Sequence, residues 1–261
     1  MKPLEQRFSE FYERWIWKLE QILHELVEVI RHRNHEELVN DAQLQALLSK
    51  VTSHVKEFYT VKWAEARENC LPFFSPIWLS PLENAYLWVT GFKPSMVYGF
   101  VDSAKNPRVP AEGVAPFVVT AEQGRKIEEL RIRTRMEEEK VEREMERIQM
   151  SMADRKIVEL AKLTIRVQNG DSTAGQVDSW VEAALKGVNA GLEKAMKGAD
   201  CVRLKALKGV LDVMTPMQGV EFLAAFLTAQ LRLRLWGKRR VMGKVELSIK
   251  PDQDPALLQI Y

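Results

Sequence analysis

Histidine is the residue type in this 261-residue sequence best suited to metal binding or acid–base chemistry, and the chain has four of them. His32 and His35 stand three residues apart at the end of a predicted helix, a spacing that presents two ring nitrogens to one metal ion. Glutamates follow directly, but no cysteine or further histidine stands at a recognised zinc spacing. His24 and His54 fall on two different predicted helices. We interpret all four as solvent-exposed or chance positions and predict no metal site.

Cysteine, serine and glycine form no recognised catalytic or cofactor-binding motif. The sequence has no Gly-x-Ser-x-Gly and no P-loop. Gly187, Gly191 and Gly198 lie in a helical pattern without the preceding strand that a dinucleotide site requires. Cys70 and Cys201 are far apart and follow no secretory signal, which predicts two free thiols in a reducing compartment. We therefore predict a protein that is not an enzyme and has no cofactor.

A cluster of six positive charges lies close to the C-terminus. Its members are Arg232, Arg234, Lys238, Arg239, Arg240 and Lys244. Such a cluster is suited to phosphates, to an anionic membrane surface or to nuclear import. It is equally suited to an exposed helix end, where cations complement the negative pole of the helix dipole. The net charge of +2 is too small to favour a nucleic-acid or membrane partner by itself.

Seven tryptophans are present, and one of them is predicted to lie on the surface. Trp15 and Trp88 lie near apolar faces of predicted helices, so we place both in the core. Trp17 lies off the apolar stripe of its helix, so we expect it either to be exposed or to cover a second element. A surface tryptophan is a typical anchor for a protein partner. Trp17 and the basic cluster are therefore the candidate partner-binding residues.

Apolar residues recur at three- and four-residue steps along most of the chain, which predicts helices. We expect them over 5–33, 41–68, 80–90, 95–101, 120–167, 177–196, 200–213 and 215–236, with Asp200 as an N-cap. The proline-containing stretch 103–118 reads as a flexible linker, and only 245–249 alternates like a strand. The predicted class is all-α, a bundle of long antiparallel helices in one domain over 5–240 with a tail over 241–261.

The predicted helix over 120–167 is unusually long and charged. Between residues 122 and 147 nine Glu face eight Lys plus Arg, while Val141, Met145, Ile148 and Met152 keep the spacing of a coiled-coil seam. Part of this helix is expected to project or to pair with a partner, so a homo-oligomer stays open. No apolar run approaches the roughly 18–20 residues of a membrane span, and no signal peptide is evident, so we expect an intracellular protein.

The segment over 78–95 has the most complete helix punctuation. Ser80 is a candidate N-cap, Pro81 takes the first helical position, and Glu83 stands where it completes a capping box. An apolar face is formed by Leu82, Ala85, Tyr86 and Val89. Gly91 is suited to the left-handed turn that ends a helix. Pro94 then stops the chain, and Ser95 offers a new N-cap.

This segment resembles the signature of the plant delay-of-germination (DOG1) domain family. The matching residues are Trp78, Pro81, Glu83, Trp88, Gly91, Pro94 and Ser95. A second block, from Ala199 through Thr215 to Trp236 and Gly237, agrees in the same order. The resemblance covers roughly residues 8–240.

The resemblance implies a plant regulator that acts by protein–protein interaction and not by catalysis. Family members regulate seed dormancy and abscisic-acid signalling through contacts with protein phosphatases, which implies a location in the nucleus or cytoplasm. Others mark plasma-membrane domains at pollen apertures, which implies peripheral membrane association. A third group forms the C-terminal part of TGA-type bZIP transcription factors, which leaves a transcription-associated, DNA-binding module as a further alternative. No basic region or zipper precedes the match here, so direct DNA binding stays open.

Two ligand questions follow from the same resemblance. Some family members are associated with haem through histidines just before the Trp-Gly pair, but Gln230 and Arg234 stand at those places here. The resemblance therefore transfers no haem ligands to this chain. An apolar molecule enclosed between helices is a further interpretation, since the many Met, Leu and Trp residues suit it as well as they suit a dry core.

Overall fold

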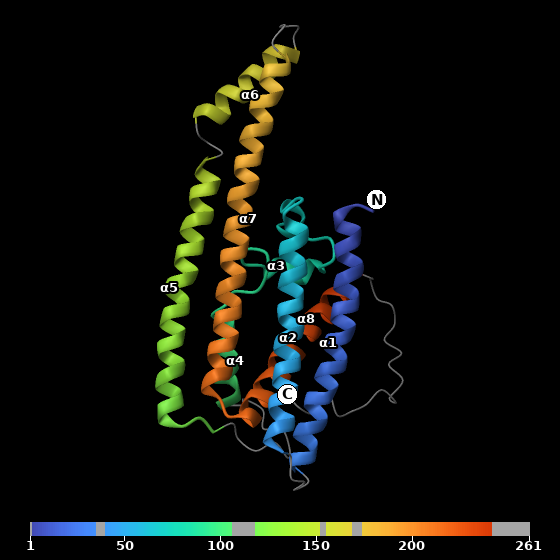
Figure 1. The fold of residues 1–261 in the computed structure, drawn as a ribbon, viewed down its shortest axis with the longest axis vertical. Helices are drawn as coiled ribbons and strands as arrows, with labels where there is room; N and C mark the ends of the chain where they lie inside the picture. The colour runs from blue at the N-terminus through green and yellow to red at the C-terminus, as the bar shows by residue number, and fades with distance from the viewer. Residues whose placement is uncertain (1, 35–39, 106–117, 152–154, 169–173, 242–261) are drawn as a thin grey trace.

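The computed structural model describes residues 2–34, 40–105, 118–151, 155–168 and 174–241, and these form an all-α fold, as predicted (Figure 1). The helices are α1 (Leu4–Asn34), α2 (Asp41–Ala66), α3 (Pro81–Ala85), α4 (Met96–Lys105), α5 (Ala121–Ser151), α6 (Arg155–Gln168), α7 (Ala174–Val213) and α8 (Pro216–Val241). A 3₁₀ turn, η1 (Leu71–Phe73), lies between α2 and α3. The single domain over 5–240 stays a prediction.

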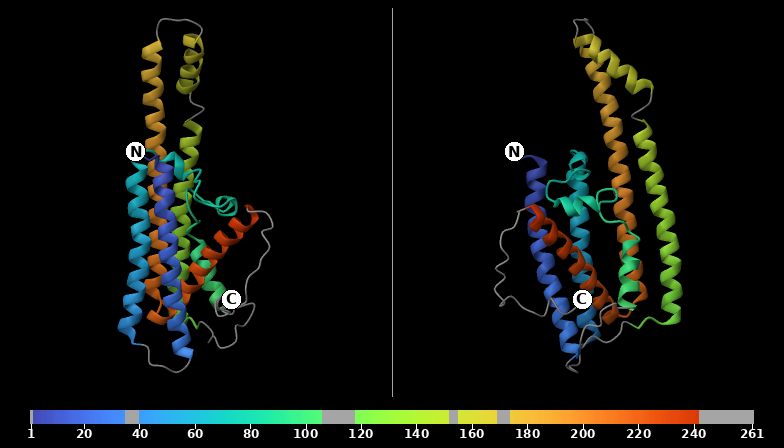
Figure 2. Two further views of the ribbon diagram at one scale, coloured as in Figure 1. Left: turned by 90° about the vertical axis from the view of Figure 1, so that its right-hand side faces the viewer. Right: turned by 180° about the vertical axis from the view of Figure 1, so that it is seen from behind.

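The main core lies where α1, α2 and α8 meet. The predicted stripe of α1 is largely buried, with Phe8, Leu19, Ile22, Leu26 and Ile30 inside. Helix α8 crosses α1 and α2, on the side nearer the viewer in the right-hand view of Figure 2, and its central residues 222–228 are all buried. Apolar residues all around the centre of α8 are therefore explained by contacts on every side, since α8 touches α1, α2, α3 and α4.

Helices α5 and α7 run antiparallel and pack closely (Figure 1). A methyl group on Gly209, Gly198 or Gly191 of α7 would lie 3.1–3.8 Å from a side chain of α5. The α5 partners follow in reverse order as Leu130, Val141 and Ile148. The predicted seam is confirmed at Val141 and Ile148, which are buried; Met145 is half-buried and Met152 lies outside the described residues. Small residues on α7 let the two backbones approach.

Capping boxes begin α5 and α8 and contact each other. Thr120 N donates to Gln123 Oε1 at 3.0 Å, and Thr215 N donates to Gln218 Oε1 at 2.8 Å, as the sequence predicts. Gln123 Nε2 also donates to Gln218 Oε1 at 2.9 Å. The two glutamines therefore join the first turns of two helices that are about 95 residues apart in sequence.

The long charged helix does not run unbroken from 120 to 167. Helix α5 ends at Ser151, whose hydroxyl donates to the Ile148 carbonyl at 2.6 Å and so satisfies a free group of the last turn. Helix α6 begins at Arg155 and packs on α7. Together α6 and the first half of α7 extend beyond α1 and α2 (Figures 1 and 2). The expected projection is confirmed, but it is formed by two helices.

Three other helix boundaries differ from expectation. Asp200 is not an N-cap, because α7 is continuous from Ala174 to Val213. Helix α8 continues past Trp236 to Val241, so part of the basic cluster is helical. Helix α4 extends to Lys105, so it includes the first residues of the predicted 103–118 linker. Residues 106–117 of that linker lie outside the described residues, as do the 242–261 tail and the weak strand predicted at 245–249.

None of the helices in the described parts of the chain is both long and apolar enough to cross a bilayer.

Candidate functional site

The segment over 78–95 is less helical than its punctuation predicts. The capping box is confirmed, since Ser80 N donates to Glu83 Oε2 at 2.7 Å and Glu83 N donates to Ser80 Oγ at 3.2 Å. Helix α3 nevertheless ends at Ala85, not near Gly91. Val89 and Thr90 then adopt positive φ angles of 41° and 64°. Branched side chains rarely take this conformation, so contacts from elsewhere must stabilise it.

Arg203 of α7 supplies those contacts. Its side chain is 1% exposed, and Nε donates to the Phe92 carbonyl at 2.6 Å. Nη2 donates to the carbonyls of Trp88 and Val89, at 2.8 Å for Val89. A Cβ at position 91 would lie 2.8 Å from Arg203 Cζ. Glycine is required at this position because the guanidinium occupies the space, not because of a left-handed turn.

Asp200 connects Arg203 to helix α2. Its carboxylate accepts from Arg203 Nη1 at 2.6 Å, from Lys62 Nζ at 2.9 Å and from Trp63 Nε1 at 2.9 Å. Lys62 also donates to Thr90 Oγ1 at 2.8 Å. Asp200, Lys62 and Arg203 are all essentially buried, so two cations share one carboxylate in the interior. Burial lowers the pKa of Lys62 to about 8 although Asp200 opposes the shift.

This buried lysine predicts a pH dependence of stability. A lysine whose pKa is lower in the folded state than in the unfolded state releases its proton sooner when folded, so stability rises with pH across that window. From about pH 7.5 to about pH 9 we expect the free energy of unfolding to rise by about 1 kcal/mol. Unfolded thiols ionise near pH 9, so the raised pKa of the Cys70 thiol acts in the opposite direction from the upper end of this range onward. Denaturant unfolding at several pH values measures the rise, and Lys62→Met should abolish it.

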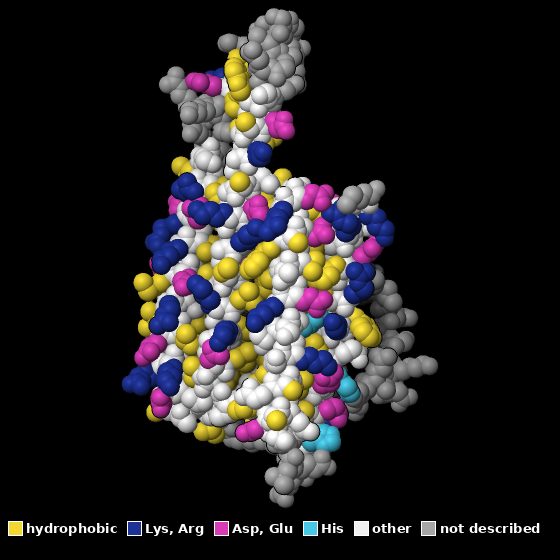
Figure 3. Space-filling model, viewed as in Figure 1, with side chains coloured by type: hydrophobic (Ala, Val, Ile, Leu, Met, Phe, Trp, Pro, Cys, Tyr) yellow, Lys and Arg dark blue, Asp and Glu magenta, His cyan; other side chains and the backbone are white. Residues whose placement is uncertain are grey.

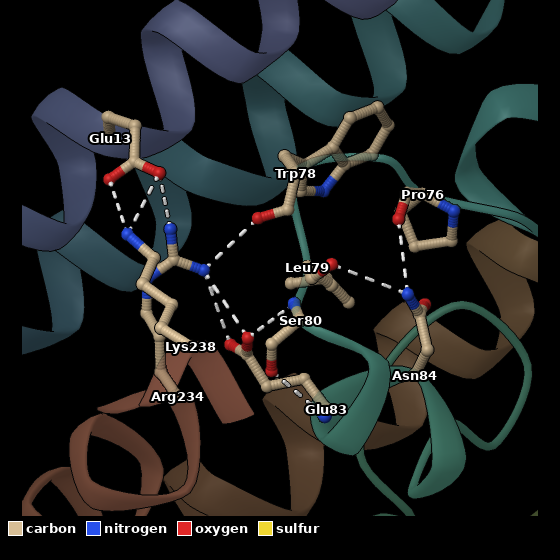
Figure 4. A network of polar contacts seen from close by, with 9 residues as sticks. All are labelled: Glu13, Pro76, Trp78, Leu79, Ser80, Glu83, Asn84, Arg234 and Lys238. Atoms are coloured by element: carbon tan, nitrogen blue, oxygen red, sulfur yellow. Dashed lines mark hydrogen bonds and ion pairs between the residues drawn. The ribbon is translucent and has the colours of Figure 1, made fainter. Parts of the chain in front are cut away.

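A second buried network joins α1, α3 and α8 (Figure 4). Arg234 is 4% exposed; Nη1 donates to the Trp78 carbonyl at 3.1 Å and lies 3.4 Å from Glu83, while Nη2 pairs with Glu13. Its guanidinium carbon lies 4.9 Å from the centre of the Tyr12 ring. Glu83 thus caps α3 and also neutralises Arg234. Arg234 was predicted to bind a partner; this assignment is wrong, because its donors face the interior.

Gly237 completes this contact. A Cβ there would lie 2.6 Å from Ser80 Cβ and closer still to its hydroxyl. Helix α8 therefore packs directly on the N-cap of α3 only because position 237 has no side chain. The lack of space for a side chain at position 237 explains the glycine in the Trp-Gly pair of the family signature.

The signature segment also contacts α5. Trp88 Nε1 donates to Glu142 Oε1 at 2.8 Å, and Ser95 N donates to Glu138 Oε1 at 2.6 Å. Trp78 and Pro94 are buried, and Trp88 packs against Val141, so its predicted place in the interior is supported. Pro81 is exposed at the first position of α3, where proline is favoured. Most signature residues therefore have a structural role.

Trp236 differs from Trp78 and Trp88, the other tryptophans of the signature, because it is 51% exposed. On the same helix Leu235 is 46% exposed, and Lys238 and Arg239 are also exposed. Lys238 Nζ lies 3.4 Å from Glu13, which precedes Trp17 by one turn of α1. Trp17 is 63% exposed, as predicted. We call Trp17, Leu235, Trp236, Lys238 and Arg239 the α1/α8 surface.

The structure thus brings together two groups of residues that the sequence separates by more than 200 positions. Arg232 of the basic cluster is half-buried. The side chain of Arg240 and all of Lys244 lie outside the described residues. The partner-binding role of Trp17, Arg232, Lys238, Arg239 and Arg240 stays a prediction.

The three histidines that the structure describes do not converge. His54 is buried, stacks on Trp15 with ring centres 4.9 Å apart, and places Nε2 3.0 Å from the Trp15 carbonyl. Trp15 is half-buried against the core. His24 and His32 are exposed, and His35 lies outside the described residues. Within the described residues, no group of three His, Cys, Asp or Glu side chains is arranged to hold a metal ion.

The two cysteines are free, and their environments predict different reactivity. Cys70 is buried with Sγ 3.1 Å from Asn189 Oδ1, and burial raises the pKa of its thiol to about 11. Cys201 is exposed. Because the thiolate is the nucleophile, a maleimide at neutral pH should modify Cys201 first and leave Cys70 protected until unfolding. Mass spectrometry of Cys201→Ser should show a nearly unlabelled folded protein; rapid labelling of that variant would contradict the buried position of Cys70.

Comparison with known proteins identifies the family. The sequence model of DOG1, described as seed dormancy control, matches residues 22–103. Protein DOG1-like 4 of Arabidopsis thaliana is 50% identical over 91% of this chain and 94% of its own length. The chain therefore belongs to the DOG1 family. Protein RESPONSE TO ABA AND SALT 1 of the same plant is 26% identical over 88% of this chain and 94% of its own length. Transcription factor TGA5 is 26% identical over 67% of this chain and 46% of its own length.

Proposed function

We propose that this protein is a DOG1-family regulator that acts by binding protein partners, in the manner of regulators of seed dormancy and abscisic-acid signalling. The observation that supports the proposal is the arrangement of the signature. Its ionisable groups, Glu83 with Arg234 and the neighbouring Asp200 with Arg203, are used in buried contacts between helices. Tryptophan, leucine and cations are accessible on the α1/α8 surface, which is the composition of a binding surface.

Affinity capture tests this function. The folded chain would be used to capture partners from developing seeds and from pollen-stage anthers, with Trp17→Ala beside the wild type. Recovery of a protein phosphatase from seed by the wild type alone supports the dormancy and abscisic-acid function. Recovery of membrane-domain proteins from anthers, with none from seed, would replace it with a role in pollen apertures. Substrate turnover that depends on a residue of the 80–95 segment would contradict the binding function altogether.

Similarity to TGA5 favours a transcription-associated module as a second candidate. Direct DNA contact would have to come from a basic surface. In Figure 3 Lys and Arg side chains over α5 and α7 alternate with Asp and Glu. Lys194 lies 3.5 Å from Glu144 and Lys205 lies 3.2 Å from Glu137 across these helices. Binding to a DNA duplex that weakens steeply with salt, and that disappears in Lys238→Glu/Arg239→Glu, would establish this alternative.

A further inference from the structure

We infer that the α1/α8 surface binds an acidic segment of a protein partner, whose apolar side chains contact Trp17 on α1 and Trp236 on α8. This inference rests on the proposed binding function and specifies the chemistry of its partner.

The first support is the arrangement of residues on α8. The exposed Leu235, Trp236 and Arg239 and the half-buried Arg232 follow the i, i+3, i+4, i+7 spacing, so they lie along one face of the helix. The opposite face carries Arg234 and Gly237, which contact α1 and α3. The face with Leu235 and Trp236 therefore points away from the core over two turns. A leucine and a tryptophan exposed side by side and flanked by arginines suit a contact, not a core.

The second support is the junction with α1. Glu13 pairs with Arg234 and Lys238, which places the last turns of α8 against the first half of α1. Trp17 follows Glu13 by four residues, so its side chain lies about 6 Å along the same side of α1. The two helices together present two tryptophans and a leucine around this junction. Trp236 lies on the face of α8 away from Arg234 and Lys238, so Trp17 and Trp236 are two separate aromatic anchors for one partner segment.

The third support is charge. Arg14 is exposed on α1, and Lys238 and Arg239 are exposed on α8. Three carboxylates lie nearby on α1: Glu10, which interacts with Lys2 and Arg14, Glu13, which pairs with Arg234 and Lys238, and the exposed Glu20. The excess of positive charge therefore lies on the α8 side, at Lys238 and Arg239, although the whole chain is nearly neutral. Charge complementarity selects a partner segment with a negative net charge.

An acidic protein segment fits these observations better than a lipid surface. Tryptophan and arginine together form the composition of protein-binding hot spots. Glu13 and Glu20 border Trp17, and an anionic bilayer would be repelled by both. A peptide can avoid Glu20 and pair with Lys238 and Arg239 on the α8 side. Because the Lys238–Glu13 pair is exposed, exchanging its partner costs little.

A phage-displayed library of random peptides, about 16 residues long, tests the inference with the full folded chain as bait. The inference predicts enrichment of peptides with negative net charge and at least one Trp, Phe or Leu. Their affinity should fall at least about tenfold on Trp17→Ala or Trp236→Ala and on Lys238→Glu/Arg239→Glu. Matched controls are Trp180→Ala, which removes another half-exposed tryptophan, and Lys140→Glu/Arg143→Glu, which reverses two exposed charges on α5. Circular dichroism confirms that each variant is folded.

The outcomes separate this inference from the proposed function. Enriched peptides that are neutral or basic, or that bind all variants equally, would overturn it. Binding to phosphatidylcholine vesicles with about 30% phosphatidylserine, with no peptide enriched, would also overturn it in favour of a lipid surface. Neither result tests whether the protein captures a partner from seed through another surface. If no partner is captured from seed, the proposed function itself fails.

Discussion

Asp200→Ala is expected to lower the free energy of unfolding by about 3–5 kcal/mol, which is a large part of the stability of an ordinary domain. The carboxylate is fully buried and is shared by Lys62, Arg203 and Trp63. Without it two buried cations face each other with no counter-charge, and desolvation of each remains uncompensated. The positive-φ segment at Val89 and Thr90 should loosen at the same time, because Arg203 and Lys62 position its carbonyl and hydroxyl groups.

Urea unfolding followed by circular dichroism measures the loss. Asp212→Ala is the matched control, since Asp212 also pairs with a lysine of α7 but is well exposed, and the midpoint should hardly move. Asp200→Asn keeps the shape and an acceptor for Trp63 while removing the charge, so its loss of stability should lie between those of Asp200→Ala and Asp212→Ala. A loss below about 1 kcal/mol for Asp200→Ala would show that the network does not contribute as the structure indicates.

Gly237→Ala is expected to destabilise the protein by about 2 kcal/mol or more, against the usual effect of this change in a helix. Alanine normally stabilises a helix interior by up to about 1 kcal/mol relative to glycine. At position 237, however, the added Cβ would overlap Ser80 and lie 3.1 Å from Leu82 Cβ. Either α8 moves away from α3, or the capping box is broken. Both results weaken the Arg234–Glu83 contact nearby.

A scan of three glycines provides the comparison. Gly187→Ala of α7 meets no atom within 4 Å, so it should be neutral or stabilising. Gly91→Ala should resemble Gly237→Ala, because its Cβ would meet the Arg203 guanidinium. Differential scanning calorimetry orders the three variants. Equal melting temperatures for Gly187→Ala and Gly237→Ala would contradict the direct packing of α8 on the α3 cap.

Local patterns in the sequence predict much of this fold. The stripe of α1, the capping boxes at Ser80, Thr120 and Thr215, and the seam at Val141 and Ile148 all depend on neighbours within a few residues. The structure confirms each of them. The exposure of Trp17 is confirmed for the same reason, since it follows from its angle around a single helix.

Contacts between distant segments were not predictable in this way. Asp200 follows an apolar helical run and so resembles an N-cap, yet its partner Lys62 lies 138 residues away. In the sequence Gly91 resembles the end of a helix. The contact with Arg203 that requires glycine there involves a distant residue, so the neighbouring residues do not reveal it. In the sequence Arg234 belongs to a basic cluster, but in the structure its buried side chain contacts Glu83 and the Trp78 carbonyl. The one local signal was the Asp200–Arg203 spacing, which places an ion pair on the buried face of α7.

We propose separate roles for two groups of residues: the buried signature residues stabilise the fold, and the α1/α8 surface binds the partner. Capture of protein partners from developing seeds, at a temperature where all baits are folded, tests this most directly with Gly91→Ala and Trp17→Ala/Arg239→Glu as baits. We predict that Gly91→Ala melts earlier but still captures the wild-type partner, whereas Trp17→Ala/Arg239→Glu keeps the wild-type melting temperature and loses the partner. Undiminished capture by Trp17→Ala/Arg239→Glu, with loss of capture by folded Gly91→Ala, would place binding in the signature and contradict the account.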